Sequence, residues 1–376
     1  MSVPTQPRRP LDMAASELDQ SDIQGVLDVL RSGRLALGPQ VEAFEQAMAE
    51  YVGVRHAVAV NSGTAALHLI VRALGLGPGD EVLVPSFTFA ASVNVLLYEG
   101  VRPVFVDITP DTYNLDPEEL ERRRTPRTRA VMVVDVFGHP APWTELQAFA
   151  ERHGLALIDD CCEALGSRYR GIPLGQLGDA GAFAFYPNKQ ITTGEGGMVV
   201  TNRDDLADLA RSMRNQGRGQ MGAWLEHERL GYNYRLPELS AALGVTQLAR
   251  LDAFVAARSA VAARYDTLLQ GLGTVTPPVV RPEVDMSYFV YVVTLQGGLH
   301  RDRVMEALQQ RGVPSRGYFA PLHQQPYLRE LLGEAPDLPV TQDAARRTLA
   351  LPFHTRLGAE DAAYVVQMLR EVTEQP

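Results

Sequence analysis

The sequence predicts an α/β protein, with a large three-layer α/β/α domain around a mainly parallel seven-stranded sheet and a smaller C-terminal α+β domain. Three observations predict this fold class. Between residues 56 and 201, short apolar runs alternate with amphipathic helical patterns, as in a parallel sheet with crossover helices. The runs are mostly β-branched and apolar on both faces, which is typical of strands covered by helices on two sides. Beyond Leu236 the pattern changes to long alanine- and arginine-rich helices.

The elements follow from periodicity and turn residues. The chain begins with two helical patterns, Ser21–Ser32, where Ser21 is the expected N-cap, and Gln40–Tyr51. The expected strands are His56–Val60, Glu81–Pro85, Val101–Asp107, Ala130–Val134, Leu155–Asp159, Ala180–Phe185 and Gly197–Thr201. Helical patterns such as Thr64–Leu74 and Trp143–His153 separate most of them, which favours parallel pairing.

Composition predicts how the chain divides. Residues 1–20 are expected to form an N-terminal arm, residues 21–250 the large domain and residues 251–376 the small domain. The boundary falls in a helical region at about 236–272, after which Thr276–Pro282 resembles a connector. The remaining tail has a strand pattern at Tyr288–Leu295 and helical patterns at Arg301–Arg311 and Ala359–Glu371.

Length, charge and cysteine content exclude several classes of protein. The chain has 376 residues, 45% of them hydrophobic, and a formal net charge of −10, which argues against nucleic acid as its main partner. No run approaches 18 consecutive apolar residues, so we expect a cytoplasmic protein without a membrane partner. Cys161 and Cys162 are adjacent, a spacing that suits neither a structural disulfide nor a zinc site, and no metal site is predicted.

Lys189 is the only lysine among the 35 lysine and arginine residues of the chain. Arginine can supply salt bridges, phosphate contacts and surface charge, but it does not form an imine with a carbonyl group, whereas lysine does. Lys189 also lies between an apolar run and the glycine-rich turn from Gly194 to Gly197, rather than on a charged helix. We therefore interpret it as an imine-forming residue; the alternative is an ordinary surface lysine.

Three further motifs lie at the ends of predicted strands. Ser62, Gly63 and Thr64 follow a strand and open a helix, where backbone N–H groups, a hydroxyl and the helix dipole could hold a phosphate. The same residues would also serve as an ordinary helix cap. Asp159 and Asp160 end another strand, at the edge of the sheet where α/β proteins bind ligands, although the two could simply begin a solvated turn.

The third motif is Pro85–Phe89, whose aromatic residues could stack on a planar cofactor or belong to the core. A phosphate cradle, an acid for a pyridine nitrogen, a stacking aromatic ring and an imine-forming lysine are the contacts that pyridoxal phosphate (PLP) requires. Their occurrence at successive strand ends indicates a PLP site.

The same motifs resemble a known family. Six segments carry the resemblance: SGTAALHL, GPGDEVLVPSFTF, PVFVDITPDTYNLDP, IDDCCEALGS, FAFYPNKQITTGEGGMVVTN and GYNYRLPELSAALGVTQLARLD. In their order and residues they are similar to the DegT/DnrJ/EryC1/StrS sugar aminotransferases. These enzymes have the aspartate-aminotransferase fold, fold type I. The resemblance runs from about Gly33 to the C-terminus and is most specific up to Leu251.

The resemblance implies a role for each matching residue. Lys189 corresponds to the Schiff-base lysine, Asp160 to the partner of the pyridine nitrogen and Phe89 to the stacking aromatic residue. Thr64, with the backbone at Gly63, would bind the phosphate.

Two further positions also match the family. Glu163 falls where members place a Gln, His or Glu near the phenolic oxygen of the cofactor. Asn233 matches the asparagine that reaches the phosphate from the neighbouring subunit, which implies a homodimer with shared active sites.

The chain departs from the family at Ala184. Many members have a serine five residues before the lysine, whose hydroxyl binds the phosphate. Losing a hydrogen bond to a charged group would cost roughly 1.5–3 kcal/mol of cofactor binding unless Ser62, water or a residue of another subunit compensates. A branch of the family that replaces the lysine with histidine performs dehydration, and Lys189 argues against that branch.

The sequence therefore predicts a PLP-dependent aminotransferase that moves an amino group, through the pyridoxamine form, from an amino acid, expected to be L-glutamate, to a nucleotide-linked ketosugar. The expected acceptor is a nucleotide-diphosphate 4-keto-6-deoxy or 3-keto hexose. The candidates for binding its diphosphate are Arg214, Arg218 and Arg229 and, more weakly, Arg316 and His323. Two alternatives stay open: a fold type I enzyme that acts on amino acids alone, such as a lyase, and a non-catalytic regulatory protein.

Overall fold

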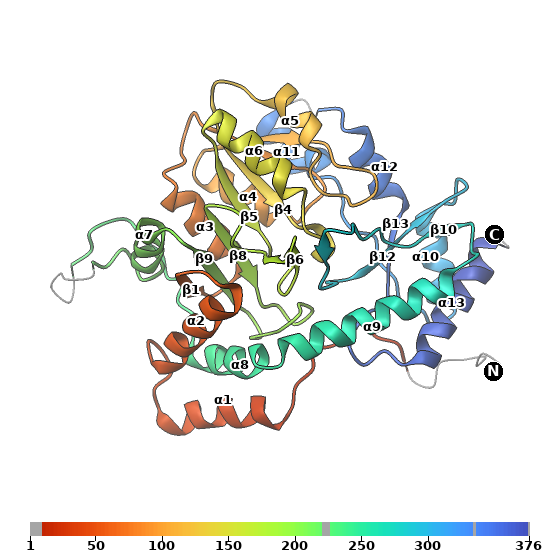
Figure 1. The fold of residues 1–376 in the computed structure, drawn as a ribbon, viewed down its shortest axis with the longest axis horizontal. Coiled ribbons are helices and arrows are strands. Elements are labelled where there is room, and N and C mark those ends of the chain that lie inside the picture. The colour runs from red at the N-terminus through yellow and green to blue at the C-terminus, as the bar shows by residue number, and fades with distance from the viewer. Residues whose placement is uncertain (1–9, 220–225, 334–335, 375–376) are drawn as a thin grey trace.

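The computed structural model in Figure 1 describes residues 10–219, 226–333 and 336–374. Residues 1–9 of the expected N-terminal arm thus lie outside the described residues. Residues 10–19 run along the body of the protein: Leu11 is buried, and the Ser16 hydroxyl donates a hydrogen bond to the Pro187 carbonyl at 2.6 Å.

A seven-stranded sheet forms the centre of the protein, with the strand order β1-β9-β8-β5-β4-β2-β3. Its strands are β1 (His56–Val60), β2 (Glu81–Pro85), β3 (Arg102–Val106), β4 (Thr128–Val134), β5 (Ala156–Asp160), β8 (Ala180–Ala184) and β9 (Gly197–Thr201). β9 runs antiparallel to both of its neighbours, and the other pairs are parallel. The predicted fold class is confirmed, and the seven strands predicted for this sheet are found with ends shifted by no more than a residue or two. The strand predicted at Tyr288–Leu295 begins later, as β12 (Tyr291–Leu295).

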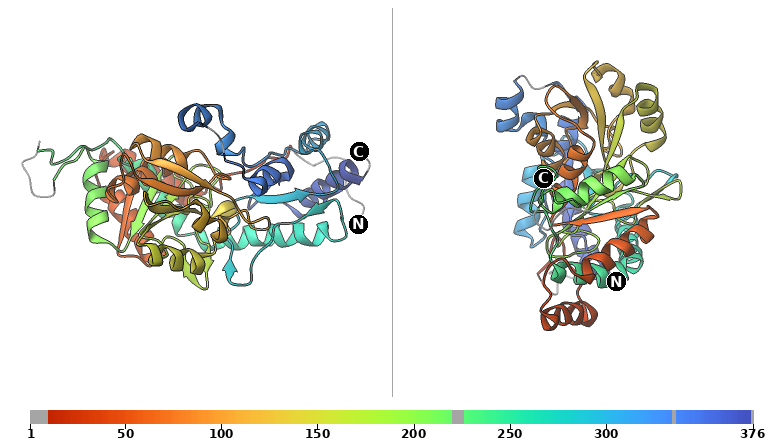
Figure 2. Two further views of the ribbon diagram at one scale, coloured as in Figure 1. Left: turned by 90° about the horizontal axis from the view of Figure 1, so that it is seen from above. Right: turned by 90° about the vertical axis from the view of Figure 1, so that its left-hand side faces the viewer.

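Helices cover both faces of this sheet. They are α1 (Gln20–Ser32), α2 (Pro39–Val52), α3 (Gly63–Ala73), α4 (Ala91–Tyr98), α5 (Pro117–Arg123), η1 (Val136–Gly138), α6 (Trp143–His153), α7 (Asp204–Arg214) and α8 (Glu238–Leu248). α3 packs on β8 and β9 beside α4 and α7, whereas α2 packs between β1 and α8. In the right-hand view of Figure 2, the green α7 and the red α2 lie on opposite sides of the orange β1.

The N-cap predicted for the first helix is wrong. α1 begins at Gln20, and its N-cap is Asp19, whose carboxylate accepts hydrogen bonds from the backbone N–H groups of Ser21 and Asp22. Asp22 in turn accepts from the Asp19 backbone N–H, at 2.9 Å, and completes a capping box. Both aspartate and serine cap helices well, so the residue type alone did not locate the first turn.

The C-terminal part contains α9 (Leu251–Leu269), α10 (Arg301–Gln310), η2 (Leu322–Gln324), α11 (Pro326–Leu332), α12 (Pro339–Arg347) and α13 (Ala359–Glu374). An antiparallel sheet joins β10 (Val275–Thr276), β12 (Tyr291–Leu295) and β13 (Thr348–Leu351). A further small sheet joins β11 (Val284–Asp285) to β6 (Arg168–Tyr169) and β7 (Ile172–Pro173).

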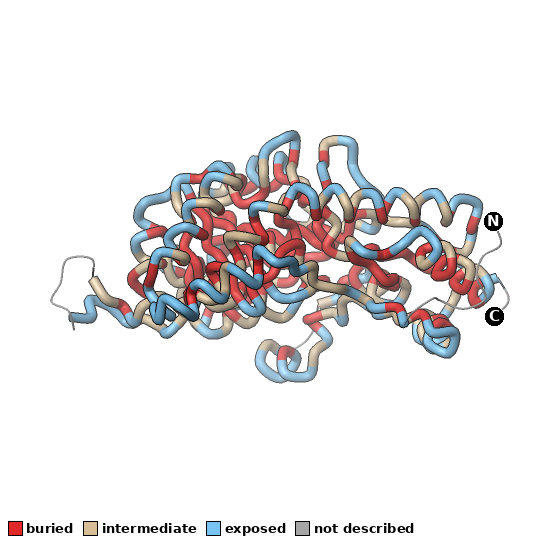
Figure 3. The backbone as a smooth tube through the Cα atoms, turned by 90° about the horizontal axis from the view of Figure 1, so that it is seen from below, coloured by how far each residue is buried: buried red, intermediate tan, exposed pale blue. Residues whose placement is uncertain are grey.

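The buried side chains form two hydrophobic clusters. α9 joins them, because Leu251 and Phe254 belong to the cluster around the large sheet, while Tyr265 and Leu269 belong to the cluster around β12. Figure 3 shows buried residues along the length of the molecule between exposed helical turns. The segment that carries η2 and α11 packs against the first cluster, although it follows the predicted domain boundary in sequence. The domain boundary stays a prediction.

Within the described ranges, no single helix is long and apolar enough to cross a membrane. α8 and α9 together would pass that test by length and composition, but the two helices are bent by 62° relative to each other.

Glu238 at the start of α8 provides a test of the packing between α8 and α2. It is 1% exposed and accepts hydrogen bonds from the backbone N–H groups of Gly38, Gln40 and Val41 at 2.9–3.1 Å, which begin α2. Glu238→Ala leaves these donors without an acceptor, and we expect the free energy of unfolding to fall by about 2–4 kcal/mol in urea titrations. The control is Glu42→Ala, which removes an exposed carboxylate from the same end of α2 and should change stability by less than about 1 kcal/mol. Equal losses in the two variants would contradict this account.

Candidate active site

A cavity of about 530 Å³ opens at the carboxyl ends of the parallel strands. Val134, Asp160 and Ala184, which are the last residues of β4, β5 and β8, all line it. The predicted cofactor-binding residues that the structure brings together here are Ser62, Gly63, Thr64, Phe89, Asp160, Glu163 and Lys189.

The N-terminus of α3 forms one wall of the cavity. Ser62 is the N-cap of α3, and its hydroxyl oxygen accepts a hydrogen bond from the Ala65 N–H at 3.1 Å. A side chain at Gly63 would place a Cβ atom 2.7 Å from the Cβ of Ala184 and 3.0 Å from the Sγ of Cys162. Only glycine therefore allows the first turn of α3 to lie this close to the end of β8. Helix N-termini offer unpaired N–H groups to an anion.

Asp160 lies on the floor of the cavity and is 6% exposed. The Ser92 hydroxyl donates a hydrogen bond to its Oδ2 at 2.6 Å, and the Cys162 N–H donates to its Oδ1 at 3.3 Å. Thr88 lies 3.0 Å from the Ser92 hydroxyl and extends this chain of hydrogen bonds toward the loop after β2. The carboxylate is thus held in one orientation by the Ser92 side chain of α4 and by the backbone N–H of Cys162.

Lys189 follows β8, and its amine reaches into the same cavity. Its Nζ atom lies 3.7 Å from Glu163 Oε1 and 3.9 Å from the centre of the Phe289 ring. The other oxygen of Glu163 accepts a hydrogen bond from the Phe137 N–H at 3.0 Å. Burial raises the pKa of Glu163, and the nearby Lys189 amine and the Phe137 N–H oppose this rise.

Aromatic side chains close two sides of the cavity. Phe89, at the start of α4, is 65% exposed, so its ring is available to contact a ligand. Phe289, Tyr318 and Phe319 reach the cavity from the C-terminal part of the chain, and Phe319 stacks on Phe137 with ring centres 5.6 Å apart. Sequence reasoning missed these three residues; the aromatic pairs Tyr288–Phe289 and Tyr318–Phe319 are visible in the sequence, but no local pattern places them at the cavity.

Arg258 of α9 was also missed, and it joins the loop of Lys189 to the tail. Its guanidinium is buried and donates hydrogen bonds to the carbonyl oxygens of Lys189, Tyr288 and Phe289 at 3.1–3.2 Å. Burial lowers the pKa of Arg258 to about 10, which leaves it charged at neutral pH. Its position within a long helix gave no sign that it would bind three backbone carbonyls.

The residues around the cavity fit PLP. Asn188 Oδ1 is buried in the cavity wall and has no hydrogen-bond partner among the described residues, as expected of a group that awaits a ligand. Asp160 offers a carboxylate for a pyridine nitrogen, the α3 N-terminus offers donors for a phosphate, and Lys189 offers a primary amine.

Asn233 does not line the cavity of its own chain. It is exposed, and its carbonyl oxygen accepts a hydrogen bond from Asn61 Nδ2 at 3.4 Å. Tyr232 and Tyr234 on either side of it stack with ring centres 4.9 Å apart and pack against His68 of α3.

The five candidates for binding the substrate diphosphate also lie outside this cavity. Arg214 is held by Glu45 and by the Ala59 carbonyl at 2.7 Å, so its guanidinium already has partners within the chain. Arg229 donates to the Ser212 hydroxyl at 2.5 Å and to Glu228 at 3.1 Å.

The other three candidates lie apart from one another. Arg218 pairs through its backbone with His227, and Arg316 is exposed and pairs through its backbone with Ala350. His323 is buried behind the loop that follows β2 and lines a different cavity.

A pair of buried carboxyl groups lies behind Asp160. Asp159 accepts a hydrogen bond from the Gly175 N–H at 2.7 Å, and Asp135 accepts from the Ala141 N–H at 2.7 Å and from Trp143 Nε1 at 3.2 Å. Each carboxyl keeps one buried oxygen without any other partner among the described residues. Burial raises the pKa of both groups, to about 6 for Asp159, and repulsion from Asp159 adds to the rise at Asp135. We infer from these shifts and from the two unpartnered oxygens that the carboxyls share a proton.

The fold and the lysine-centred cavity at the carboxyl ends of its strands define the class of protein, an aminotransferase. The sequence matches the DegT/DnrJ/EryC1/StrS aminotransferase family over residues 16–370, and the chain belongs to this family. The resemblance stated from the motifs is therefore confirmed, and the protein is an enzyme.

Relatives of known name and structure extend over nearly the whole chain. GDP-perosamine synthase of Caulobacter vibrioides is 41% identical over 367 residues, which cover 96% of this chain and 98% of the relative. The dTDP-3-amino-3,4,6-trideoxy-alpha-D-glucose transaminase of Streptomyces venezuelae is 40% identical over 377 residues, which cover 98% and 97%. The putative sugar aminotransferase Spr1654 of Streptococcus pneumoniae, solved in its PLP form, superposes with a TM-score of 0.93 at 27% identity, covering 98% of this chain and 99% of that one. The family and this structure imply pyridoxal phosphate as the cofactor.

The shared proton of Asp135 and Asp159 predicts a pH-dependent stability. The pKa of Asp159 is raised from an unfolded value near 4, so the folded state keeps a proton that the unfolded chain has released, and stability falls as pH rises from about 4 to about 6. Asp159→Asn supplies the shared hydrogen permanently. We measure the free energy of unfolding of Asp159→Asn minus that of the native protein by urea unfolding. We expect this difference to be about 1–3 kcal/mol more favourable to the variant at pH 7 than at pH 4.5.

The control for this measurement is Asp205→Asn. Its exposed carboxylate has a pKa lowered by a hydrogen bond from Arg203, so the pH dependence of its contribution to stability lies below about pH 4. The relative stability of Asp205→Asn should thus change little between pH 4.5 and pH 7. A pH-independent difference for Asp159→Asn would rule out the shared proton.

Proposed function

We propose that this enzyme transfers an amino group from an amino acid, expected to be L-glutamate, to the ketone of a nucleotide-diphosphate sugar, with PLP held in the cavity around Lys189. The observation that carries the proposal is that the only lysine of the chain ends in a cavity that Asp160 and the N-terminus of α3 also line. An amine, a carboxylate and an anion-binding helix end are the three polar contacts that PLP needs.

Lys189 would hold the cofactor as a Schiff base and, once freed, would move a proton at its Nζ atom between the α-carbon of the amino acid and the cofactor. When bound, PLP supplies a ring that withdraws electrons from that carbon. Asp160, held by Ser92, would keep the pyridine nitrogen protonated. Glu163 lies 3.7 Å from Nζ, within reach of the same part of the cofactor.

Ser62 explains how the chain tolerates Ala184. The Ser62 oxygen accepts its hydrogen bond from Ala65, so its hydroxyl hydrogen remains available to donate to a phosphate oxygen. Together with the Thr64 hydroxyl and the N–H groups of the first turn of α3, it would replace the donor that many family members have at position 184.

The acceptor assignment is supported by the relatives. One is named for a GDP-linked and another for a dTDP-linked amino sugar, and both match along nearly the full length of this chain. We therefore assign a nucleotide-diphosphate ketosugar, a 4-keto-6-deoxy or a 3-keto hexose, as the acceptor. Arg214 is poorly suited to meet its diphosphate, because its guanidinium is already held by Glu45.

A homodimer is part of the proposal. Asn233 lies on the surface outside its own cavity, as a residue that completes the site of a neighbour would. Exposed apolar side chains on α1 and the loop after it are consistent with a covered surface; they are Ile23, Leu27, Leu30, Leu35 and Leu37. The cytoplasmic location and the domain division stay predictions that accompany this function.

The acceptor can be identified by half-reactions. The holoenzyme is converted to its pyridoxamine form with glutamate, the keto acid is removed, and candidate acceptors are added one at a time. We expect ketosugar nucleotides to restore the absorbance of the pyridoxal form much faster than free keto acids do. Lys189→Arg is the control and should show neither half-reaction, because its guanidinium stays protonated. Rapid recovery with free keto acids alone would identify an enzyme of amino acids and reject the sugar assignment.

Shared active sites predict complementation between two inactive variants. Asn233→Ala and Lys189→Ala are each expected to have little activity. A mixed dimer has one site with both defects and one site with neither, so mixing the proteins after dissociation should restore up to about half of the native activity per mixed dimer. Absence of recovery, with mixed dimers demonstrated by mass spectrometry, would place Asn233 in the site of its own chain or outside any site.

A further inference from the structure

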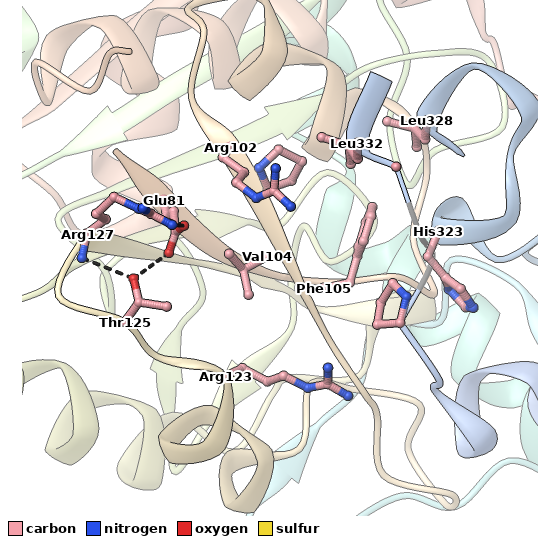
Figure 4. Close-up of a pocket in the computed structure, with 13 residues that line it drawn as sticks. Glu81, Arg102, Val104, Phe105, Arg123, Thr125, Arg127, His323, Leu328 and Leu332 are labelled. Carbon is pink, nitrogen blue, oxygen red and sulfur yellow. Dashed lines mark hydrogen bonds and ion pairs between the residues drawn. The ribbon is translucent and has the colours of Figure 1, made fainter. Parts of the chain in front are cut away.

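A second cavity, of about 440 Å³, lies along β3, the edge strand of the large sheet (Figure 4). We call it the β3-edge cavity; its walls are the strand residues Arg102–Phe105, the segment from Arg123 to Arg127, and Leu328 and Leu332 of α11. It shares no lining residue with the cavity around Lys189. Its volume falls within the range of about 300–1,000 Å³ that is usual for small-molecule sites.

The charge of the β3-edge cavity is opposite to that of the protein. Among the described residues, its charged lining consists of three arginines and one carboxylate, in a chain of net charge −10. That carboxylate, Glu81, is 2% exposed, forms an ion pair with Arg127 at 2.5 Å and accepts a hydrogen bond from the Thr125 hydroxyl at 2.5 Å. The two remaining guanidinium groups therefore give the cavity a net positive charge.

Arg102 and Arg123 are available to an anion. The exposed side chain of Arg102 makes no hydrogen bond or ion pair with any described residue, although it belongs to the lining of the cavity. Arg123 donates to the Asp337 carbonyl at 3.2 Å, and its Nε approaches Glu119 only to 4.0 Å. In Figure 4 the two side chains lie on either side of Val104.

His323 adds an unpaired hydrogen-bond donor to the wall. The Ser86 hydroxyl oxygen accepts from the His323 backbone N–H at 3.0 Å and lies 2.7 Å from its Nδ1. In the tautomer in which this hydroxyl donates to Nδ1, the ring proton is on Nε2. His323 is 2% exposed, and its Nε2 has no partner in the described part of the chain. Burial lowers the pKa of His323, which keeps the ring neutral at pH 7.

Apolar groups complete the wall. Phe105 is 5% exposed, with its ring centre 6.2 Å from that of His323, and Leu328 and Leu332 face the same space from α11. A ligand that satisfies this lining combines an anionic group, a hydrogen-bond acceptor and a flat apolar body.

We propose that the β3-edge cavity is a second binding site, for a nucleotide whose phosphate is held by Arg102 and Arg123, whose base lies against Phe105 and α11, and whose acceptor atom meets His323 Nε2. Arginine suits phosphate because its planar fork engages two oxygens together. The site does not depend on the assignment of the amino acceptor, since it lies apart from Lys189.

Occupancy of this site reaches the cofactor cavity through Ser86. Ser86 follows β2 and lies three residues before Phe89, which lines the cavity around Lys189. When Nε2 donates to an acceptor on the ligand, His323 must carry its ring proton on Nε2, and the Ser86 hydroxyl then donates to Nδ1. The backbone of Ser86 is held as well, because its carbonyl accepts a hydrogen bond from the Leu322 N–H at 3.0 Å. A bound nucleotide thereby restrains the loop that presents Phe89, so the site is regulatory.

The test is a calorimetric titration of the holoenzyme with UDP, GDP and dTDP, with inorganic phosphate as a separate probe. Arg102→Ser should weaken the binding of at least one nucleotide by roughly tenfold or more, the loss expected for a charge-assisted hydrogen bond. The matched control is Arg129→Ser, which removes an exposed arginine from the same end of the sheet, outside the cavity. His323→Asn keeps an acceptor for Ser86, removes the Nε2 donor and should weaken the same binding.

Each outcome decides the proposal. Unchanged nucleotide binding in Arg102→Ser, or equal weakening in Arg129→Ser, would overturn it, because any nucleotide bound would then occupy another site. Inorganic phosphate binding as tightly as the nucleotides would reject the nucleotide class. Amide hydrogen exchange of residues 86–89 should slow on nucleotide addition in the native protein and not in Arg102→Ser, and no change in the native protein would refute the regulatory role. A failed ketosugar assignment would leave the Arg102-dependent binding intact, so the two proposals can fail separately.

Discussion

The close approach of α3 to the end of β8 is the constraint on which the active site depends. Gly63 leaves no room for a Cβ beside Ala184 and Cys162, and a Cβ at Gly197 on β9 would collide with the Ser62 carbonyl. These glycines allow the N-terminus of α3 to lie directly against β8, which precedes Lys189, and against β9, which follows it. The anion-binding helix end and the amine thus meet in one cavity because two positions have no side chain.

Arg258 holds the part of the cavity wall that comes from the C-terminal half of the chain. One guanidinium donates hydrogen bonds to the carbonyls of Lys189, Tyr288 and Phe289, and thereby joins the loop after β8 to the segment before β12. Phe289 in turn packs its ring against the amine of Lys189. A buried arginine that satisfies three carbonyls is stable because its charge-assisted hydrogen bonds offset part of the desolvation cost. The C-terminal part of the chain is therefore joined to the loop of Lys189 by Arg258, which is not itself a reacting group.

The elements near the sheet could be predicted because each leaves a local signal. A parallel strand buried on both faces is a short β-branched run, and residues after such strands must meet at one edge, so Lys189, Asp160 and Thr64 could be placed together from the sequence alone. Phe289, Tyr318 and Arg258 could not, because their place depends on how the tail folds back over the sheet. The five arginine and histidine candidates for the diphosphate were chosen by type and proximity in sequence, and Arg214 shows the limit of that choice, because its partner Glu45 lies far away along the chain.

The composition of the chain has a chemical consequence beyond marking Lys189. An aldehyde cofactor forms reversible adducts with any accessible ε-amino group, so surface lysines compete for it and blur its spectrum. This protein carries its surface charge on arginine, which does not form such adducts, and Lys189 is 13% exposed inside a cavity that matches the rest of the cofactor. If Lys189 binds pyridoxal phosphate as proposed, no other ε-amino group of the chain competes for the cofactor. In the proposed function, the phosphate contacts would then need only to retain the cofactor at this single amine, without selecting it from others, so a phosphate site that lacks a serine at position 184 would suffice.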